Sequence, residues 1–81
     1  MTVITLIGKP GCHLCEDARR VVDEVVASLD DPARVAIEER SILDDKALHD
    51  RYWDEIPVVL IDGEVHTFWR VDPDRLRAAL A

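Results

Sequence analysis

The chain is poor in positive charge and has no long hydrophobic run. Its 81 residues carry 10 Lys and Arg against 17 Asp and Glu, which gives a net charge of −7. That balance disfavours nucleic acid or an anionic membrane surface as a partner. No apolar run approaches the length of a membrane span, and no basic region precedes a signal-like apolar core. We therefore expect a cytoplasmic protein that binds neither nucleic acid nor membranes.

Cysteine is also scarce, since Cys12 and Cys15 are the only two. Structural disulfides are rare in the cytoplasm, where a Cys-x-x-Cys pair is more typical of catalysis or metal binding. A zinc site needs about four ligands, and none of the histidines forms a second paired motif. Glu16 follows Cys15 at the position where haem attachment requires histidine. The pattern favours redox chemistry with no metal and no organic cofactor.

The cysteine pair lies where a predicted strand ends and a predicted helix begins. Residues 2–7 are apolar and β-branched, as in a buried strand. Apolar residues then recur at helical spacing across residues 13–29. The turn between these elements is supplied by Gly8, Pro10 and Gly11. The two cysteines therefore occupy one face of the first helical turn, close enough to form a disulfide.

This position predicts different roles for the two thiols. Unpaired backbone N–H groups and the positive end of the helix dipole stabilise a thiolate at a helix N-terminus. Cys12, at the end of the helix, is the predicted nucleophile, and Cys15, one turn further in, is the predicted resolving thiol. Glu16 and Asp17 follow closely, and their negative charge opposes the thiolate. We therefore expect a moderate lowering of the pKa of Cys12.

The rest of the chain predicts three more strands. Their apolar patterns lie at residues 35–39, 56–61 and 64–68. Because proline lacks the N–H that a central strand needs, Pro57 belongs at the entrance of its strand. Asp62-Gly63 is a typical two-residue hairpin turn between the last two strands.

Two further helices complete the predicted order. Asp44 or Asp45 caps a short helix that ends at Tyr52, and Asp72 caps a last helix with Pro73 in its first position. The order is then β-α-β-α-β-β-α in one domain, residues 1–81. A right-handed crossover makes the first two strands parallel, and the final hairpin is antiparallel. The predicted fold class is α/β, with a four-stranded mixed sheet and three helices on its faces.

This order resembles the thioredoxin superfamily, with Cys-x-x-Cys after the first strand and Ile56-Pro57-Val58 opening the third. The chain length and the run Lys9-Pro10-Gly11-Cys12 are most similar to a glutaredoxin. The resemblance covers the whole chain and implies a thioredoxin-like fold and thiol–disulfide oxidoreductase activity. It also implies that Pro57 is cis and faces the disulfide. The backbone beside this proline is then free to pair with an extended substrate.

The resemblance also implies which residues bind the substrate. In glutaredoxins the lysine that matches Lys9 helps to hold glutathione and favours the thiolate, and the segment that matches Ile56, Pro57 and Val58 lies along the substrate. Two departures are plain: His13-Leu14 replaces the usual proline and aromatic pair, and Phe68-Trp69-Arg70-Val71 replaces a Gly-Gly pair that grips glutathione. We therefore expect poor glutathione binding, with Trp69 flanking the site and offering an apolar surface to a protein partner.

Three functions remain as hypotheses at this point. The favoured one is a monomeric thiol–disulfide oxidoreductase that acts on protein or small-molecule disulfides, with a reductase or a low-molecular-weight thiol as its electron source. The first alternative is a binding module that holds an iron–sulfur cluster or zinc between two subunits through Cys12. The second is a structural domain in which Cys12 is unreactive.

Overall fold

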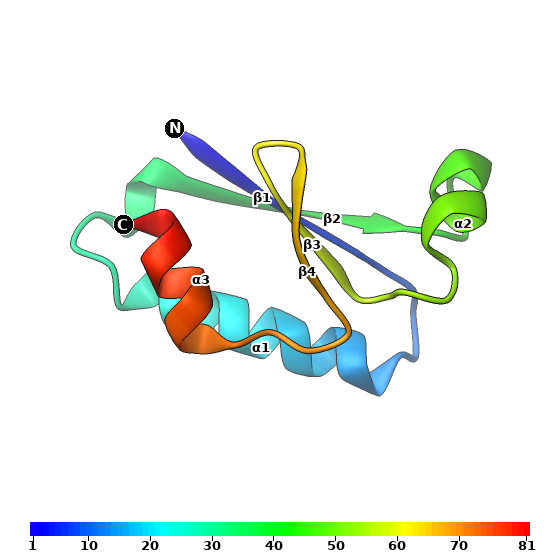
Figure 1. Ribbon diagram of the computed structural model, residues 1–81, viewed down its shortest axis with the longest axis horizontal. Coiled ribbons are helices and arrows are strands. Elements are labelled where there is room, and N and C mark those ends of the chain that lie inside the picture. Colours follow the sequence, from blue (N-terminus) through cyan, green and yellow to red (C-terminus); the bar gives the residue numbers. More distant parts are fainter.

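The computed structural model describes residues 1–81 and contains the predicted order of elements (Figure 1). The strands are β1 (Thr2–Gly8), β2 (Val35–Ser41), β3 (Val58–Ile61) and β4 (Glu64–Phe68). The helices are α1 (His13–Ala27), α2 (Lys46–Tyr52) and α3 (Pro73–Leu80), with a short 3-10 turn at Pro32–Arg34. The predicted β-α-β-α-β-β-α order is therefore confirmed. None of the helices combines the length and apolar character that a membrane crossing needs.

The four strands form one mixed sheet in the order β2-β1-β3-β4. β1 pairs in parallel with β2, while β3 is antiparallel to both of its neighbours, β1 and β4. In the β1–β3 pair, Ile7 lies opposite Val58. This register matters for the site, because it brings the end of β1, just before the cysteine pair, to the start of β3, just after Pro57.

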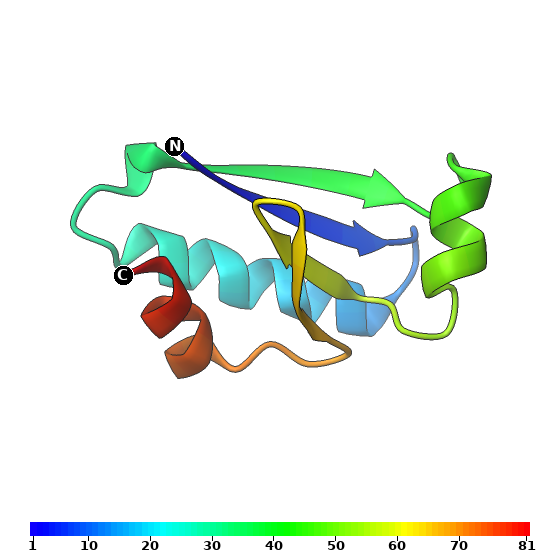
Figure 2. The same ribbon diagram turned by 45° about the horizontal axis from the view of Figure 1, so that its top comes forward.

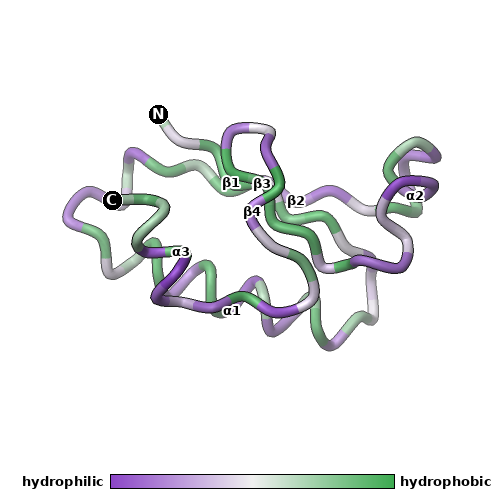
Figure 3. Tube along the Cα trace, viewed as in Figure 1, coloured by the Kyte–Doolittle hydropathy of each residue, from purple (hydrophilic) through white to green (hydrophobic).

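The larger part of the core lies between the sheet and the helices α1 and α3, which share one face of the sheet (Figure 2). Every second residue of a strand points to the same face, so Ile4 and Leu6 of β1 enter this cluster. They pack with Val22 and other valines of α1, and with Leu76 of α3, which is completely buried. Figure 3 shows the corresponding hydrophobic stretch along β1 and β3.

A smaller cluster lies on the opposite face, where α2 packs. Its buried members are Ile7, Ile42, Tyr52 and Val58. Both strands that carry the site therefore contribute to two cores, with neighbouring residues pointing to opposite faces. α2 lies beside the ends of β1 and β2, at the end of the molecule opposite the chain termini (Figures 1 and 2). The start of α1, and with it the cysteine pair, lies at this same end.

Polar residues mark the starts of α2 and α3 and the turn between β3 and β4. The Asp45 and Asp72 side chains accept hydrogen bonds from the first backbone N–H groups of α2 and α3, as predicted. Asp62 and Gly63 both adopt positive φ angles, 50° and 86°, which is the geometry of a tight two-residue hairpin turn.

Four predicted boundaries were wrong. The parallel pairing of β1 with β2 continues to Gly8 and Ser41, so β1 ends at Gly8 rather than Ile7 and β2 at Ser41 rather than Glu39. α1 ends at Ala27 rather than Leu29, because the Ser28 hydroxyl donates to the Val25 carbonyl and closes the last turn. β3 begins at Val58 rather than Ile56, because Pro57 has no N–H to continue the ladder.

Candidate functional site

The first half of the site is the cysteine turn, residues 8–15, which links β1 to α1. Gly11 has a φ of +76°, a conformation that glycine adopts readily, and the chain then enters the helix. Cys12 is the N-cap residue of α1, with an extended backbone, and Cys15 lies in the first turn. The two residues form a disulfide with their Cα atoms 5.2 Å apart, as the spacing predicts.

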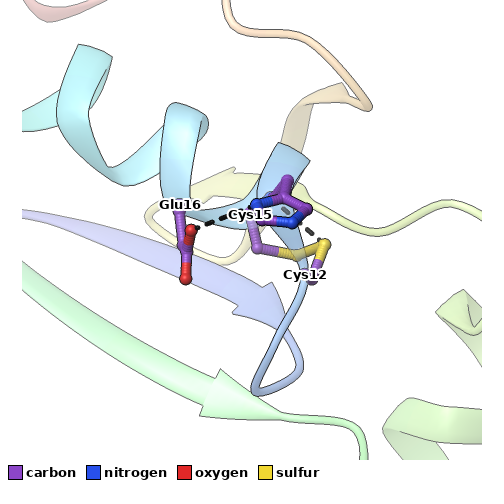
Figure 4. The surroundings of a disulfide bond; sticks show 4 residues. Cys12, Cys15 and Glu16 are labelled. Carbon is purple, nitrogen blue, oxygen red and sulfur yellow. Dashed lines mark hydrogen bonds and ion pairs between the residues drawn. A yellow bond between two sulfur atoms is a disulfide. The ribbon is translucent and has the colours of Figure 1, made fainter.

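The sulfur of Cys12 takes the position that a polar capping side chain normally occupies. Its Sγ accepts a hydrogen bond from the backbone N–H of Cys15 over 3.2 Å (Figure 4). The backbone carbonyl of Cys12 accepts the first helical hydrogen bond, from Glu16. The N–H that contacts Sγ is one of the donors that a helix start leaves unpaired. When the disulfide is reduced, the same N–H favours a thiolate on Cys12.

Charged side chains surround the first turn without closing over it. His13 is 97% exposed, and its Nδ1 lies 3.6 Å from a carboxylate oxygen of Glu16, which extends from the same turn in Figure 4. Lys9 forms no ion pair and lines a groove of about 430 Å³ together with Gly8, Cys15 and Pro57. Cys15, Pro57 and Lys9, three of the predicted site residues, therefore line one groove.

Gly8 has a role that the sequence did not indicate. A Cβ atom placed on Gly8 would lie 2.7 Å from Sγ of Cys15 and 3.1 Å from its Cβ. Such distances are too short for carbon and sulfur in ordinary contact, so any side chain here displaces Cys15. In the sequence Gly8 resembles a simple turn residue, and only the fold shows that the sulfur of Cys15 fills its missing side-chain space.

The second half of the site is the proline loop, Asp54–Pro57, which links α2 to β3. The Ile56–Pro57 peptide bond is cis, which confirms the expectation from the resemblance. Pro57 is buried and lines the same groove as Cys15. Ile56 packs its side chain against the smaller core cluster, while neither its amide nor its carbonyl forms a hydrogen bond within the chain.

The other predicted substrate-binding residues differ in what they expose. Val58 is completely buried in the smaller cluster, so its side chain holds β3 in place and does not reach the groove. Trp69 is 52% exposed and follows directly on β4. Its ring meets that of Phe68 edge-on, with the ring centroids 5.1 Å apart.

Trp69 also borders a hollow of about 210 Å³, which lies against a different side of α1 from the groove that contains Cys15. Leu14, Ala18, Val21 and Val71 supply most of its apolar lining. Phe68 and Trp69 thus bring bulk to the segment that the resemblance matches to the two glycines of glutaredoxins. Trp69 makes a contact that the sequence did not reveal: its indole N–H donates to the backbone carbonyl of Asp54 over 3.0 Å.

The structure contains no group of three or more His, Cys, Asp or Glu side chains that converge as metal ligands. The alternative of a cluster between two subunits requires ligands from a second chain, and no observation in this structure favours it.

The fold and the Cys-x-x-Cys pair at the start of α1 define a thioredoxin-like protein. A structural-genomics target protein from X. campestris, solved by X-ray crystallography, superposes with a TM-score of 0.74 at 30% identity, over 95% of this chain and 93% of that one. A mutant thioredoxin from Halobacterium salinarum superposes with a TM-score of 0.66 over 96% of this chain and 70% of that one. At 20% identity, this second likeness concerns the fold alone.

The chain belongs to the glutaredoxin-like domain family (DUF836), whose model matches residues 3–81. An uncharacterized protein of Mycobacterium tuberculosis is 30% identical over 79 residues, which cover 96% of this chain and 81% of that protein. A protein of Dictyostelium discoideum described as glutaredoxin-like is 31% identical over 75 residues, which cover 90% of this chain and 69% of that protein. Family, fold and disulfide-forming pair together support a redox function.

Proposed function

We propose that the protein is a thiol–disulfide oxidoreductase that reduces or exchanges disulfides through Cys12 and Cys15. The observation that carries this proposal is the hydrogen bond from the Cys15 amide to Sγ of Cys12, at the N-terminus of α1. It supplies the Cys12 sulfur with a donor that stabilises negative charge. The resemblance to glutaredoxins supports the same roles for the two thiols.

In the proposed reaction the Cys12 thiolate attacks one sulfur of a substrate disulfide. The substrate S–S bond breaks, one substrate thiolate leaves, and a mixed disulfide with Cys12 forms. Cys15, as a thiolate, then attacks Sγ of Cys12 and releases the second substrate thiol. The enzyme now holds the Cys12–Cys15 disulfide, and the substrate has gained two electrons. A reductase or a low-molecular-weight thiol restores the dithiol by the same exchange in reverse.

The proposed substrate is a disulfide whose cysteine lies in an extended protein segment. The free amide and carbonyl of Ile56 offer hydrogen bonds to such a backbone, in the manner of strand addition. The exposed face of Trp69 and the neighbouring apolar hollow add a surface that suits an apolar side chain. Lys9 contributes a positive charge to the groove, although a single exposed ion pair is typically worth only ~0–1 kcal/mol.

The same features argue for weak use of glutathione. Glycines permit a ligand to approach the backbone closely because they lack a Cβ atom. Phe68 and Trp69 occupy that position here, and their rings already contact each other. We therefore expect glutathione to support only slow turnover compared with a typical glutaredoxin.

Two coupled assays test this proposal. Disulfide reduction is followed by NADPH oxidation, once with glutathione and glutathione reductase and once with a thioredoxin reductase. Turnover with the reductase that exceeds turnover with glutathione supports both the activity and the weak glutathione site. Brisk glutathione turnover, equal to that of a typical glutaredoxin, contradicts the second part only.

A complementary experiment identifies the substrate and tests the alternatives. In a Cys15→Ser variant the mixed disulfide on Cys12 cannot be resolved, so partners accumulate and are identified by mass spectrometry. Metal analysis and absorbance of freshly purified protein test for an iron–sulfur cluster or zinc. Absence of any disulfide turnover, together with an alkylation rate of Cys12 like that of a free thiol, would refute the proposal.

A further inference from the structure

Trp69 adopts a backbone conformation that its side chain disfavours. Its φ angle is +68°, in the left-handed region that glycine occupies readily and residues with a Cβ atom occupy rarely. Only one other residue with a Cβ atom shares this feature, Asp62 in the hairpin turn. A bulky aromatic residue in this region needs compensating contacts to stay there.

Both hydrogen bonds that Trp69 donates go to the proline loop. The backbone N–H of Trp69 donates to the carbonyl of Pro57 over 2.8 Å, and its indole N–H donates to the carbonyl of Asp54 over 3.0 Å. Asp54 and Pro57 are the first and last residues of the loop. A single residue therefore holds both ends of the loop, with Ile56 between them.

The loop has few other polar restraints. At its start, the Glu55 amide donates to the carbonyl of Tyr52 over 2.8 Å. Ile56 has no hydrogen bond of its own and is held by side-chain packing alone. The direction in which the Ile56 amide and carbonyl point thus depends on how firmly the loop ends are held.

We propose that Trp69 is a positioning residue that grips the proline loop and so presents the Ile56 backbone to an extended substrate. This inference rests on the proposed function, because it needs a substrate that pairs with Ile56. It assigns Trp69 no contact with the reacting sulfurs. Losing the indole hydrogen bond therefore weakens substrate binding and leaves the chemistry of Cys12 intact.

A packing role alone does not account for these contacts. About half of the Trp69 side chain remains exposed, so burial explains only part of its place. A phenylalanine at position 69 would place a similar ring beside Phe68, but it has no N–H group to donate to Asp54. The indole donor is the part of Trp69 that reaches the loop, and it is the part that the experiment removes.

The test compares Trp69→Phe with Trp53→Phe. Trp53 is 60% exposed, and its indole forms no hydrogen bond, which makes it a matched control. Each variant is assayed with a peptide mixed disulfide, which has a backbone to pair with Ile56, and with 5,5′-dithiobis(2-nitrobenzoate), which has none. The alkylation rate of reduced Cys12 with iodoacetamide reports the thiol itself.

Trp69→Phe should raise KM for the peptide disulfide by about threefold to tenfold, as expected for one lost hydrogen bond. Its kcat, its rate with the small aromatic disulfide and its alkylation rate should stay within about twofold of wild type. Trp53→Phe should change none of these. If Trp69→Phe unfolds, Trp69→Gly is used instead, since glycine relieves the backbone conformation and also lacks the indole. Because glycine also removes the apolar surface of Trp69, its KM is measured with a peptide that carries only alanine beside the cysteine.

Three outcomes would overturn the inference. An unchanged KM for the peptide disulfide means that the indole bond does not position the loop. Equal losses with the peptide, the small disulfide and iodoacetamide indicate a general structural role. An equal rise in KM for Trp53→Phe shows that the effect is not specific to the indole bond of Trp69.

Failure of the proposed function itself is recognised separately, by absent disulfide turnover in the wild type. The positioning role is then measured by NMR relaxation of the backbone amides. Trp69→Phe should lower the order parameter of the Ile56 amide from a rigid value of about 0.85, while Trp53→Phe should not. An unchanged order parameter in Trp69→Phe also overturns the inference.

Discussion

The two halves of the candidate site are held together in different ways. The cysteine turn is built from neighbouring residues: its helix cap joins Cys12 and Cys15, three positions apart. The proline loop is held from a distance, since the indole of Trp69 reaches Asp54 across 15 positions. This difference indicates that the reacting thiols keep their geometry through local structure, whereas the substrate-facing backbone depends on the assembled fold. Substitutions in the two halves should therefore have separable effects.

The largest expected effect is loss of the nucleophile. Cys12→Ser should abolish disulfide reduction, by at least about 1,000-fold, because serine is a poor nucleophile for disulfides at neutral pH. Cys15→Ser should still form the mixed disulfide on Cys12 in a single turnover. Stopped-flow measurement of thiol release distinguishes the two variants. Release of substrate thiol by Cys12→Ser at the wild-type rate would reverse the assigned roles.

Gly8→Ala should sharpen the comparison within the cysteine turn. The added methyl group would lie 2.7 Å from Sγ of Cys15, so the disulfide form should lose about 1–3 kcal/mol of unfolding free energy through overpacking. The loss should be smaller in the reduced form, where Sγ can rotate away. Urea denaturation of the oxidised and reduced variant, beside wild type in both states, gives the difference. Equal losses in both states would show that the contact with Sγ is unimportant.

A pH effect is expected outside both halves of the site. His66 lies at an irregularity in the β3–β4 pairing, and its Nε2 is buried without a hydrogen-bond partner. Burial, and then the positive charge of Arg75, lower the pKa of His66 in the folded protein. The unfolded chain therefore binds a proton that the folded protein resists, and stability should fall as the pH drops below about 6.5.

His66→Gln should reduce that loss of stability between about pH 6.5 and pH 5, relative to wild type. His49→Gln, at an exposed position on α2, is the matched control. Thermal unfolding at several pH values measures the effect. If disulfide turnover changes over the same pH range in wild type but not in His66→Gln, then protonation of His66 on β4 affects the site. The description of the site as two independent halves would then be wrong.

The smallest expected effect belongs to Lys9. Its side chain is exposed and forms no ion pair, so Lys9→Ala should weaken binding of an anionic substrate by ~0–1 kcal/mol, at most about fivefold in KM. The effect should shrink as salt is added, because exposed charges are screened. Steady-state assays at low and high ionic strength measure it. A tenfold or larger effect that salt leaves unchanged would place Lys9 in direct, desolvated contact with the substrate.

The difference between local contacts in the cysteine turn and long-range contacts at the proline loop also explains which features the sequence could predict. The strand, turn and helix around Cys12 follow from residue types and spacing within a short segment, and each was correctly expected. The cis bond before Pro57 came only through resemblance, since most such bonds are trans. The bond from Trp69 to Asp54 depends on how distant segments of the chain come together, and the fit of Cys15 against Gly8 depends on how the turn places the first residues of α1 against the end of β1. No local pattern encodes those contacts.

The pairing of Ile7 with Val58 has a consequence for the population of folded molecules. Both residues are buried in the smaller cluster, while Leu6 and Val59, their neighbours, are buried in the larger one. A slip of β3 by one residue against β1 would turn the side chains of β3 to the opposite faces, so Val58 and Val59 would each leave their cluster, and Pro57 would shift relative to the cysteine turn at the same time. Conformers without an assembled site are thus also poorly packed ones. The packing that stabilises the sheet therefore also disfavours those β1–β3 registers in which Pro57 and the cysteine turn are not brought together.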